Sequence, residues 1–149
     1  MDNKYLEGLG RVIVNFSSLE MYLSFLIWRL METGLELGKI ITCELSFQGK
    51  INLLASVYKL KFGIPKGSEV DLLIKRLVKA EEDRNKIMHS CWLIDEKNKK
   101  TTRYKITAKQ KQGLKDNFEE FNTQHVNKIA NFIGDLTKDL GRLITKHSP

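Results

Sequence analysis

The sequence is poor in the residues from which most metal and phosphate sites are built. Its two cysteines, Cys43 and Cys91, lack metal-ligand spacing, and nothing in the sequence argues for a disulfide between them. No paired set of cysteine or histidine ligands is present, and neither standard glycine-rich phosphate loop occurs. We therefore expect no metal and no cofactor, with both thiols reduced in a cytosolic protein.

Signals for export or membrane insertion are also missing. Met1 is followed by polar residues rather than by a short cationic stretch and an apolar core, which argues against a signal peptide. The longest apolar run, residues 12–31, is interrupted by Asn15, Glu20 and Arg29, which argues against a membrane span. We expect a cytoplasmic protein without membrane contact.

What the chain has in quantity is positive charge. Its 149 residues are enough for one domain, residues 1–149, and the contents of 42% hydrophobic and 29% charged residues are typical of a globular protein. The net charge of +7 favours a polyanionic partner. The alternative is a well-solvated basic surface without such a partner.

The spacing of apolar residues predicts four to five helices. The longest covers residues 5–32, shorter ones are expected at 37–45 and 50–62, and another starts at Ser68, whose hydroxyl can cap its first turn. One apolar arc of the long helix should face the core and consists of Val12, Phe16, Leu19, Leu23, Leu26, Ile27 and Leu30. A second arc, on roughly the opposite side, consists of Val14, Met21, Phe25 and Trp28. In so small a chain, two apolar sides favour burial against a second copy, and we predict a homodimer.

A basic β-hairpin is expected after the helix that starts at Ser68. Residues 91–94 and 101–107 alternate in polarity as strands require. Cationic side chains are dense here: Lys97, Lys99, Lys100, Arg103, Lys105, Lys109 and Lys111. They are candidates for contact with nucleic acid, and the alternative is a solvated loop. A capping box at residues 107–110 predicts the start of the last helix, whose stripe includes Leu114, Phe118 and a partly buried His125. The predicted fold is all-α: an antiparallel helical bundle with a small hairpin.

The chemistry-bearing residues concentrate at Arg84, Asn85 and His89. An arginine directs two donors onto a phosphate, and a histidine transfers protons near neutral pH. On an ideal helix Arg84 and His89 point about 140° apart, which suits a site assembled from two chains. Glu20 lies on the apolar side of the first helix, and Arg84 is a candidate partner for it; the alternative is that Glu20 reaches solvent. In the plainer interpretation Arg84 pairs with Glu81 or another carboxylate, and His89 merely occupies a helix end.

The segment Arg84-Asn85-Lys86-Ile87-Met88-His89 resembles the signature of the HEPN superfamily, small all-helical domains that are often ribonucleases of toxin–antitoxin and other defence systems. The resemblance implies metal-independent cleavage of RNA to a cyclic 2′,3′-phosphate at a site shared by two subunits. His89 would move the proton, Arg84 would stabilise the transition state, and Asn85 would position the phosphate or a catalytic group.

Two other functions remain open. The chain can be a non-catalytic dimeric module that binds nucleic acid or a nucleotide, in which the motif is structural. It can also be a protein-interaction subunit that binds through Phe25 and Trp28. The expected partners are RNA, a second copy of the chain and an antitoxin or other regulatory protein.

Overall fold

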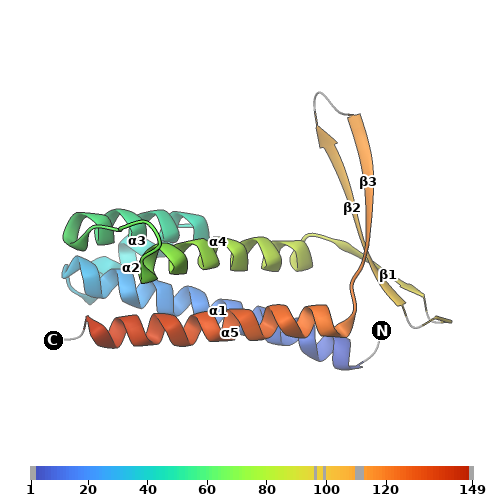
Figure 1. The fold of residues 1–149 in the computed structure, drawn as a ribbon, viewed down its shortest axis with the longest axis horizontal. Helices are drawn as coiled ribbons and strands as arrows, with labels where there is room; N and C mark the ends of the chain where they lie inside the picture. The colour runs from blue at the N-terminus through green and yellow to red at the C-terminus, as the bar shows by residue number, and fades with distance from the viewer. Residues whose placement is uncertain (1–2, 96, 99, 110–112, 148–149) are drawn as a thin grey trace.

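The computed structural model describes residues 3–95, 97–98, 100–109 and 113–147 (Figure 1). Within these ranges the elements follow in the order α1 (Asn3–Met31), α2 (Leu35–Cys43), α3 (Phe47–Phe62), α4 (Glu69–Met88), β1 (Cys91–Asp95), β2 (Lys100–Lys109), β3 (Gly113–Glu120) and α5 (Thr123–Lys146). The helices form an elongated body, and the strands lie at one end of it.

The core forms where α5 packs along α1, with α3 and α4 covering the same side (Figure 1). The predicted inner arc of α1 is confirmed, because all seven of its residues are buried. The facing stripe of α5 consists of Val126, Ala130, Ile133, Leu136, Leu140 and Leu143. Each fully buried leucine or isoleucine contributes about 1.5–3 kcal/mol relative to exposure, so this seam stabilises the body.

Side-chain caps fix where the helices begin. The predicted cap of α4 is confirmed, because the Ser68 hydroxyl accepts a hydrogen bond from the Asp71 N–H. Ser46 caps α3 in the same way. The N-terminus of α5 has a reciprocal cap: the Asn122 side chain accepts from the His125 N–H, and His125 Nδ1 accepts from the Asn122 N–H. His125 is therefore an exposed capping residue, whereas partial burial was expected.

The all-α prediction was wrong, because the chain combines its helices with a three-stranded antiparallel sheet in the order β1-β2-β3. Residues 107–109 end β2 and Gly113–Glu120 form β3, where the start of the last helix was expected. Leu114 and Phe118 are four residues apart, a spacing that imitates a helix. It also places both side chains on one face of a strand, where the period is two.

The strands β2 and β3 form an arm that projects from the helical body (Figure 1). Lys105 lies opposite Asn117, and Tyr104 lies opposite Phe118, so successive pairs point to opposite faces. We call the face with Tyr104 and Phe118 the outer face; its residues are Thr102, Tyr104, Ile106, Ala108, Leu114, Asp116, Phe118 and Glu120. We call the other the inner face; its described side chains are Arg103, Lys105, Thr107, Lys115, Asn117 and Glu119.

Candidate functional site

The motif residues lie at the C-terminal end of α4. The helix ends at Met88, and His89 follows as its C-cap, with φ of −110° and ψ of 31°. The His89 N–H still donates to the Asn85 carbonyl, at 3.0 Å. Arg84 and Asn85 are half-buried and His89 is exposed.

Arg84 is held without a carboxylate. Its Nη1 donates to Asn85 Oδ1 at 2.9 Å, and its Cζ lies 5.1 Å from the centroid of the Phe16 ring. A cation over an aromatic face is attracted by the ring quadrupole. Arg84 forms no ion pair with any acidic side chain in the described ranges. Its position is therefore fixed while most of its donors stay available.

The expected pair between Arg84 and Glu20 does not form. Glu20 instead binds Lys50 Nζ, at 2.7 Å, and the Lys50 side chain is only 10% exposed. Lys50 lies on the stripe of α3 that also carries Phe47, Ile51 and Leu54, so the helix turns its ammonium toward α1. A lysine within an apolar stripe was the signal that could have identified this partner.

Glu81 is a second carboxylate near Arg84, and it is half-buried. Burial raises the pKa of its carboxyl, while a hydrogen bond from the Gln48 backbone N–H and the charge of Arg84 oppose that rise. Gln48 lies in the first turn of α3, so Glu81 supplies an acceptor to that helix N-terminus. Glu20, Lys50 and Glu81 are thus committed to the fold, whereas Arg84 has no ion pair among the described residues.

His89 has an imidazole without a hydrogen-bond or ion-pair partner among the described residues. The structure brings Arg84 and Asn85 into contact, and the His89 side chain forms no hydrogen bond with either. Either role that a histidine takes in catalysis, proton acceptor or proton donor, is open to an exposed imidazole.

The expected nucleic-acid-binding cations are placed differently from one another. Arg103 is 8% exposed: Nε donates to the Lys86 carbonyl at 3.2 Å and to Ser90 Oγ at 2.7 Å, and Nη1 pairs with Glu119 at 2.8 Å. It joins the sheet to α4, and its Nε and Nη1 are engaged within the chain, although Arg103 also lines the groove described below.

The remaining expected cations are exposed or outside the described residues. Lys97 and Lys100 flank the turn between β1 and β2, and Lys100 lies 3.4 Å from Glu120. Lys105 is exposed on the inner face of the arm. Lys99, Lys111 and the side chain of Lys109 lie outside the described residues.

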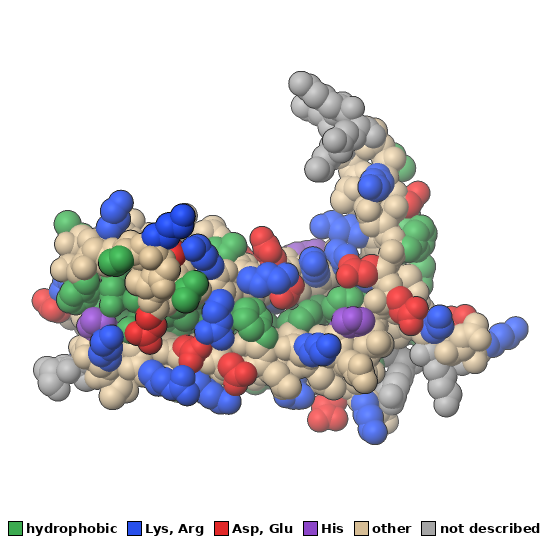
Figure 2. Space-filling model, viewed as in Figure 1, with side chains coloured by type: hydrophobic (Ala, Val, Ile, Leu, Met, Phe, Trp, Pro, Cys, Tyr) green, Lys and Arg blue, Asp and Glu red, His purple; other side chains and the backbone are tan. Residues whose placement is uncertain are grey.

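Two lysines that sequence reasoning did not select join Lys105. Lys86 of α4 and Lys115 of β3 line an open groove with it, of about 630 Å³, where the arm meets the end of α4. Figure 2 shows Lys and Arg side chains, with Asp and Glu side chains beside them, in this corner between the arm and the body. Lys115 was missed because its segment was expected to be helical. Lys86 could have been selected from the sequence, because it lies inside the motif.

The second arc of α1 is only partly free. Val14, Met21 and Phe25 are exposed, at 64%, 50% and 41%. Trp28 is instead covered by α2: its Nε1 donates to Thr42 Oγ1 at 2.8 Å, and a Cβ at Gly38 would lie 2.6 Å from the indole. Trp28 is therefore half-buried within its own chain, and it offers less surface to a dimer interface than Val14, Met21 and Phe25 do.

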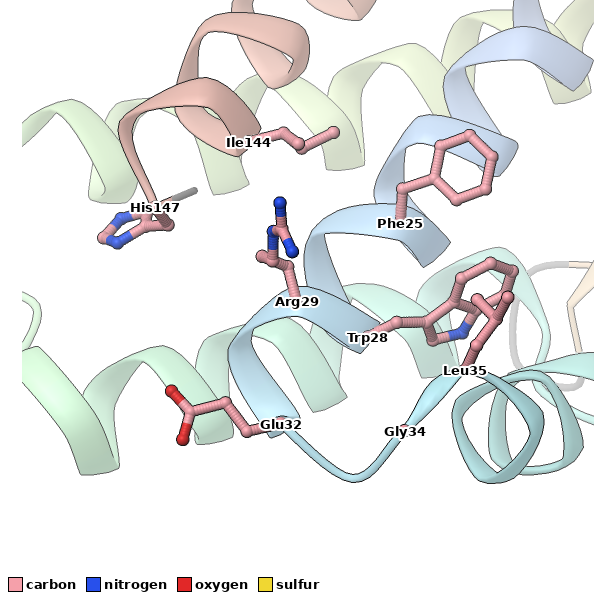
Figure 3. A pocket seen from close by; sticks show the side chains of 8 residues that line it. All are labelled: Phe25, Trp28, Arg29, Glu32, Gly34, Leu35, Ile144 and His147. Carbon is pink, nitrogen blue, oxygen red and sulfur yellow. The ribbon is translucent and has the colours of Figure 1, made fainter. Parts of the chain in front are cut away.

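An open pocket of about 750 Å³ lies at the end of the body remote from the sheet. Figure 3 shows Arg29 of α1 directed toward the end of α5, from which Ile144 and His147 project. Phe25, Trp28, Glu32 and Leu35 complete its lining. None of the motif residues contributes to it.

Within the described ranges, no three His, Cys, Asp or Glu side chains are grouped closely enough to hold a metal ion. None of the helices found in those ranges combines the length and the apolar character that crossing a membrane requires. Comparisons of the chain with family models, with curated proteins and with solved structures found no match.

Proposed function

We propose that the chain is a metal-independent endoribonuclease of the HEPN type that acts as a homodimer. The observation that supports this proposal is that neither charged group of the motif is neutralised within the chain. The Arg84 guanidinium has no ion pair, and the His89 imidazole has no hydrogen-bond or ion-pair partner, among the described residues. In the plainer interpretation, Arg84 would form an ion pair with Glu81 or another carboxylate. Glu20 forms its ion pair with Lys50 instead.

The proposed reaction uses the nucleophile that RNA carries. The ribose 2′-oxygen attacks the adjacent phosphorus, and the His89 imidazole accepts the proton of that hydroxyl. The bond from phosphorus to the 5′-oxygen breaks, and this oxygen takes a proton from the now protonated His89 imidazole or from water. The products are a cyclic 2′,3′-phosphate and a 5′-hydroxyl. DNA lacks the 2′-hydroxyl, so it is not cleaved.

Arg84 and Asn85 act on the phosphate. The guanidinium stabilises the negative charge that develops on the phosphorane-like transition state. Its contacts with Asn85 and with the Phe16 ring hold it in place before the substrate binds, which reduces the reorganisation that the reaction requires. Asn85 orients Arg84 and retains its amide N–H groups for the phosphate.

The two chains share the site in this proposal. On an ideal helix, residues five positions apart point about 140° apart. His89 is the C-cap of α4 rather than a helical residue, and its imidazole forms no hydrogen bond with Arg84 or Asn85. Two copies related by a twofold axis bring Arg84 of one chain toward His89 of the other, and the symmetry creates two equal sites. Because unrestrained cleavage of RNA harms the cell that makes the enzyme, we also propose a cytoplasmic defence or toxin–antitoxin role with an inhibitory partner protein.

The test uses Arg84→Ala and His89→Ala, each of which should lower RNA cleavage at least about a hundredfold. Mixing the two inactive proteins in equal amounts, with exchange of subunits, should form heterodimers that contain one intact site. Since half of the dimers are then mixed, about a quarter of the original activity should return. Cleavage is measured on a labelled RNA by gel electrophoresis.

The controls are circular dichroism, which should show an unchanged helical fold, and addition of EDTA, which should leave cleavage unchanged. No recovery on mixing would show that both residues act within one chain. Full activity in either variant, together with loss of activity in EDTA, would contradict the HEPN-type mechanism.

A further inference from the structure

The two faces of the β2–β3 arm differ in chemistry. The outer face carries Tyr104 stacked on Phe118, with ring centroids 4.9 Å apart, together with exposed Ile106 and Leu114. The inner face is polar and, with Lys86 of α4, lines the open groove of about 630 Å³. The groove reaches the end of α4 that carries the motif, because Lys86, between Arg84 and His89 in the sequence, lines it. Arg84, Asn85 and His89 do not line it themselves.

The charge of the groove is unbalanced. Its one carboxylate among the described residues, Glu119, is neutralised by Arg103 at 2.8 Å. Lys86, Lys105 and Lys115 form no ion pair with any acidic side chain that the structure describes. Three lysines therefore line one groove without an ion-pair partner among the described residues, a situation that favours an anionic ligand.

The groove is also held in shape. Arg103 fastens β2 to the end of α4 through the Lys86 carbonyl and Ser90 Oγ. Asn117 Nδ2 lies 3.2 Å from Thr107 Oγ1 and 3.3 Å from the carbonyls of Lys105 and Lys115, which joins the two strands across this face. Lys105 and Lys115 are diagonal neighbours, and such neighbours lie about 7–8 Å apart. Lys105 and Lys115 thus present two cationic side chains next to each other on the inner face of the arm.

We infer that this groove binds the sugar–phosphate backbone of single-stranded RNA and leads the strand to the end of α4. The inference rests on the proposed function and adds to it a path along which RNA binds. This path does not include the turn between β1 and β2, none of whose described residues lines the groove. A single strand fits better than a duplex, since attack by the 2′-oxygen in line with the leaving 5′-oxygen requires a strand that can depart from helical geometry. Lysines contact phosphates without reading bases, so binding should tolerate many sequences.

The experiment measures binding separately from cleavage. A fluorescent 12-nucleotide oligouridylate with 2′-O-methyl groups cannot be cleaved by the proposed route, so the unaltered chain can be titrated with it at several salt concentrations. The variant is Lys105→Gln with Lys115→Gln. The matched control is Lys59→Gln with Lys66→Gln, which removes the same charge from two exposed lysines without ion pairs to described residues. A third variant, Lys97→Gln with Lys100→Gln, tests the turn between β1 and β2.

Loss of two phosphate contacts should make the slope of log affinity against log salt less steep by about 1.4, since each contact to a single strand contributes about 0.7. The control should keep the original slope, and all variants should keep the original melting temperature because the replaced lysines are exposed. An unchanged slope in the groove variant, a larger change in the turn variant, or no binding by the unaltered chain would overturn the inference.

Cleavage of unmodified RNA, measured in parallel, separates this inference from the proposed function. Binding that depends on Lys105 and Lys115, without any cleavage, would support the groove and contradict the proposed endoribonuclease activity. Cleavage that depends on His89, with binding that ignores Lys105 and Lys115, keeps the enzyme and removes the groove.

Discussion

At the scale of single residues, Tyr5 stands out because its hydroxyl is buried without a hydrogen-bond partner among the described residues. The ring is 2% exposed and meets Trp92 edge-on, with centroids 5.9 Å apart. Burial raises the pKa of its hydroxyl to about 12. The ring contributes to packing, and the hydroxyl adds a desolvation cost that no hydrogen bond to a described residue offsets.

Tyr5→Phe should therefore leave the free energy of unfolding at pH 7 unchanged or raise it by up to about 1 kcal/mol. The matched control is Tyr58→Phe, which removes a hydroxyl 3.4 Å from His147 Nε2 and should cost about 0.5–1 kcal/mol. Urea unfolding followed by circular dichroism measures both. A Tyr5→Phe variant that is less stable than the Tyr58→Phe variant would show that the Tyr5 hydroxyl has a partner.

The same substitution has a predictable pH dependence. The unfolded chain releases the Tyr5 proton near pH 10, and the folded chain keeps it to about pH 12. Ionisation of the Tyr5 hydroxyl in the unfolded chain therefore lowers the free energy of unfolding of the unaltered protein as the pH rises from 10 to about 12. The stability gained by Tyr5→Phe should be larger at pH 11 than at pH 7.

Residue by residue, the sequence was informative where the signal is local. Arg84, Asn85 and His89 could be selected because the motif lies within six consecutive residues. The partner of Glu20 was harder to select, because Lys50 is 30 positions away and the direction of its side chain depends on how α3 packs against α1. The one local signal was a lysine within the apolar stripe of α3.

At the scale of elements, the helical body was predictable and the third strand was not. Buried faces of helices repeat with a period near 3.6, and α1 and α4 follow it. In β3, the large apolar side chains Leu114 and Phe118 are 73% and 65% exposed, so no buried face within the chain imposes a pattern on them. Without burial, a spacing of four fits a helix and a strand equally well.

Arg103 is the element-scale contact that holds the sheet against the helices. Arg103→Met should lower the free energy of unfolding by about 1–3 kcal/mol, because it leaves the Lys86 carbonyl and Ser90 Oγ without their donor and Glu119 without its cation. Urea unfolding followed by tryptophan fluorescence reports the change, since Trp92 lies in β1.

Lys100→Gln is the matched control for Arg103→Met. It removes a cation of the same strand whose pair with Glu120 is long, at 3.4 Å, and 59% exposed on both sides, so the change should stay within about 0.5 kcal/mol. Equal effects of the two substitutions would contradict an anchoring role for Arg103.

At the scale of the whole molecule, the surface of α1 bears on the proposed dimer. Val14, Met21 and Phe25 remain exposed on the arc opposite the core. Scattered apolar residues are normal on a protein surface, whereas a row along one helix is typical of an interface. Trp28 does not belong to this row, because it packs against Gly38 and its replacement would disturb α2.

Met21→Glu combined with Phe25→Glu should therefore convert the protein to a monomer at micromolar concentration while the helical content stays unchanged. Two carboxylates placed on each copy would repel across a twofold axis and would lose hydration on association. Size-exclusion chromatography with light scattering measures the mass. Leu60→Glu is the control, since Leu60 is 88% exposed on α3 and away from this arc.

The monomeric variant should also lose RNA cleavage, although Arg84 and His89 are intact in every chain. A composite site needs both copies, so activity should fall with the dimer and should return as protein concentration is raised far enough to restore it. Light scattering that gives a monomer for the unaltered protein at micromolar concentration would remove the dimer, and with it the shared site. A monomeric variant that cleaves at the original rate would assign both residues to one chain.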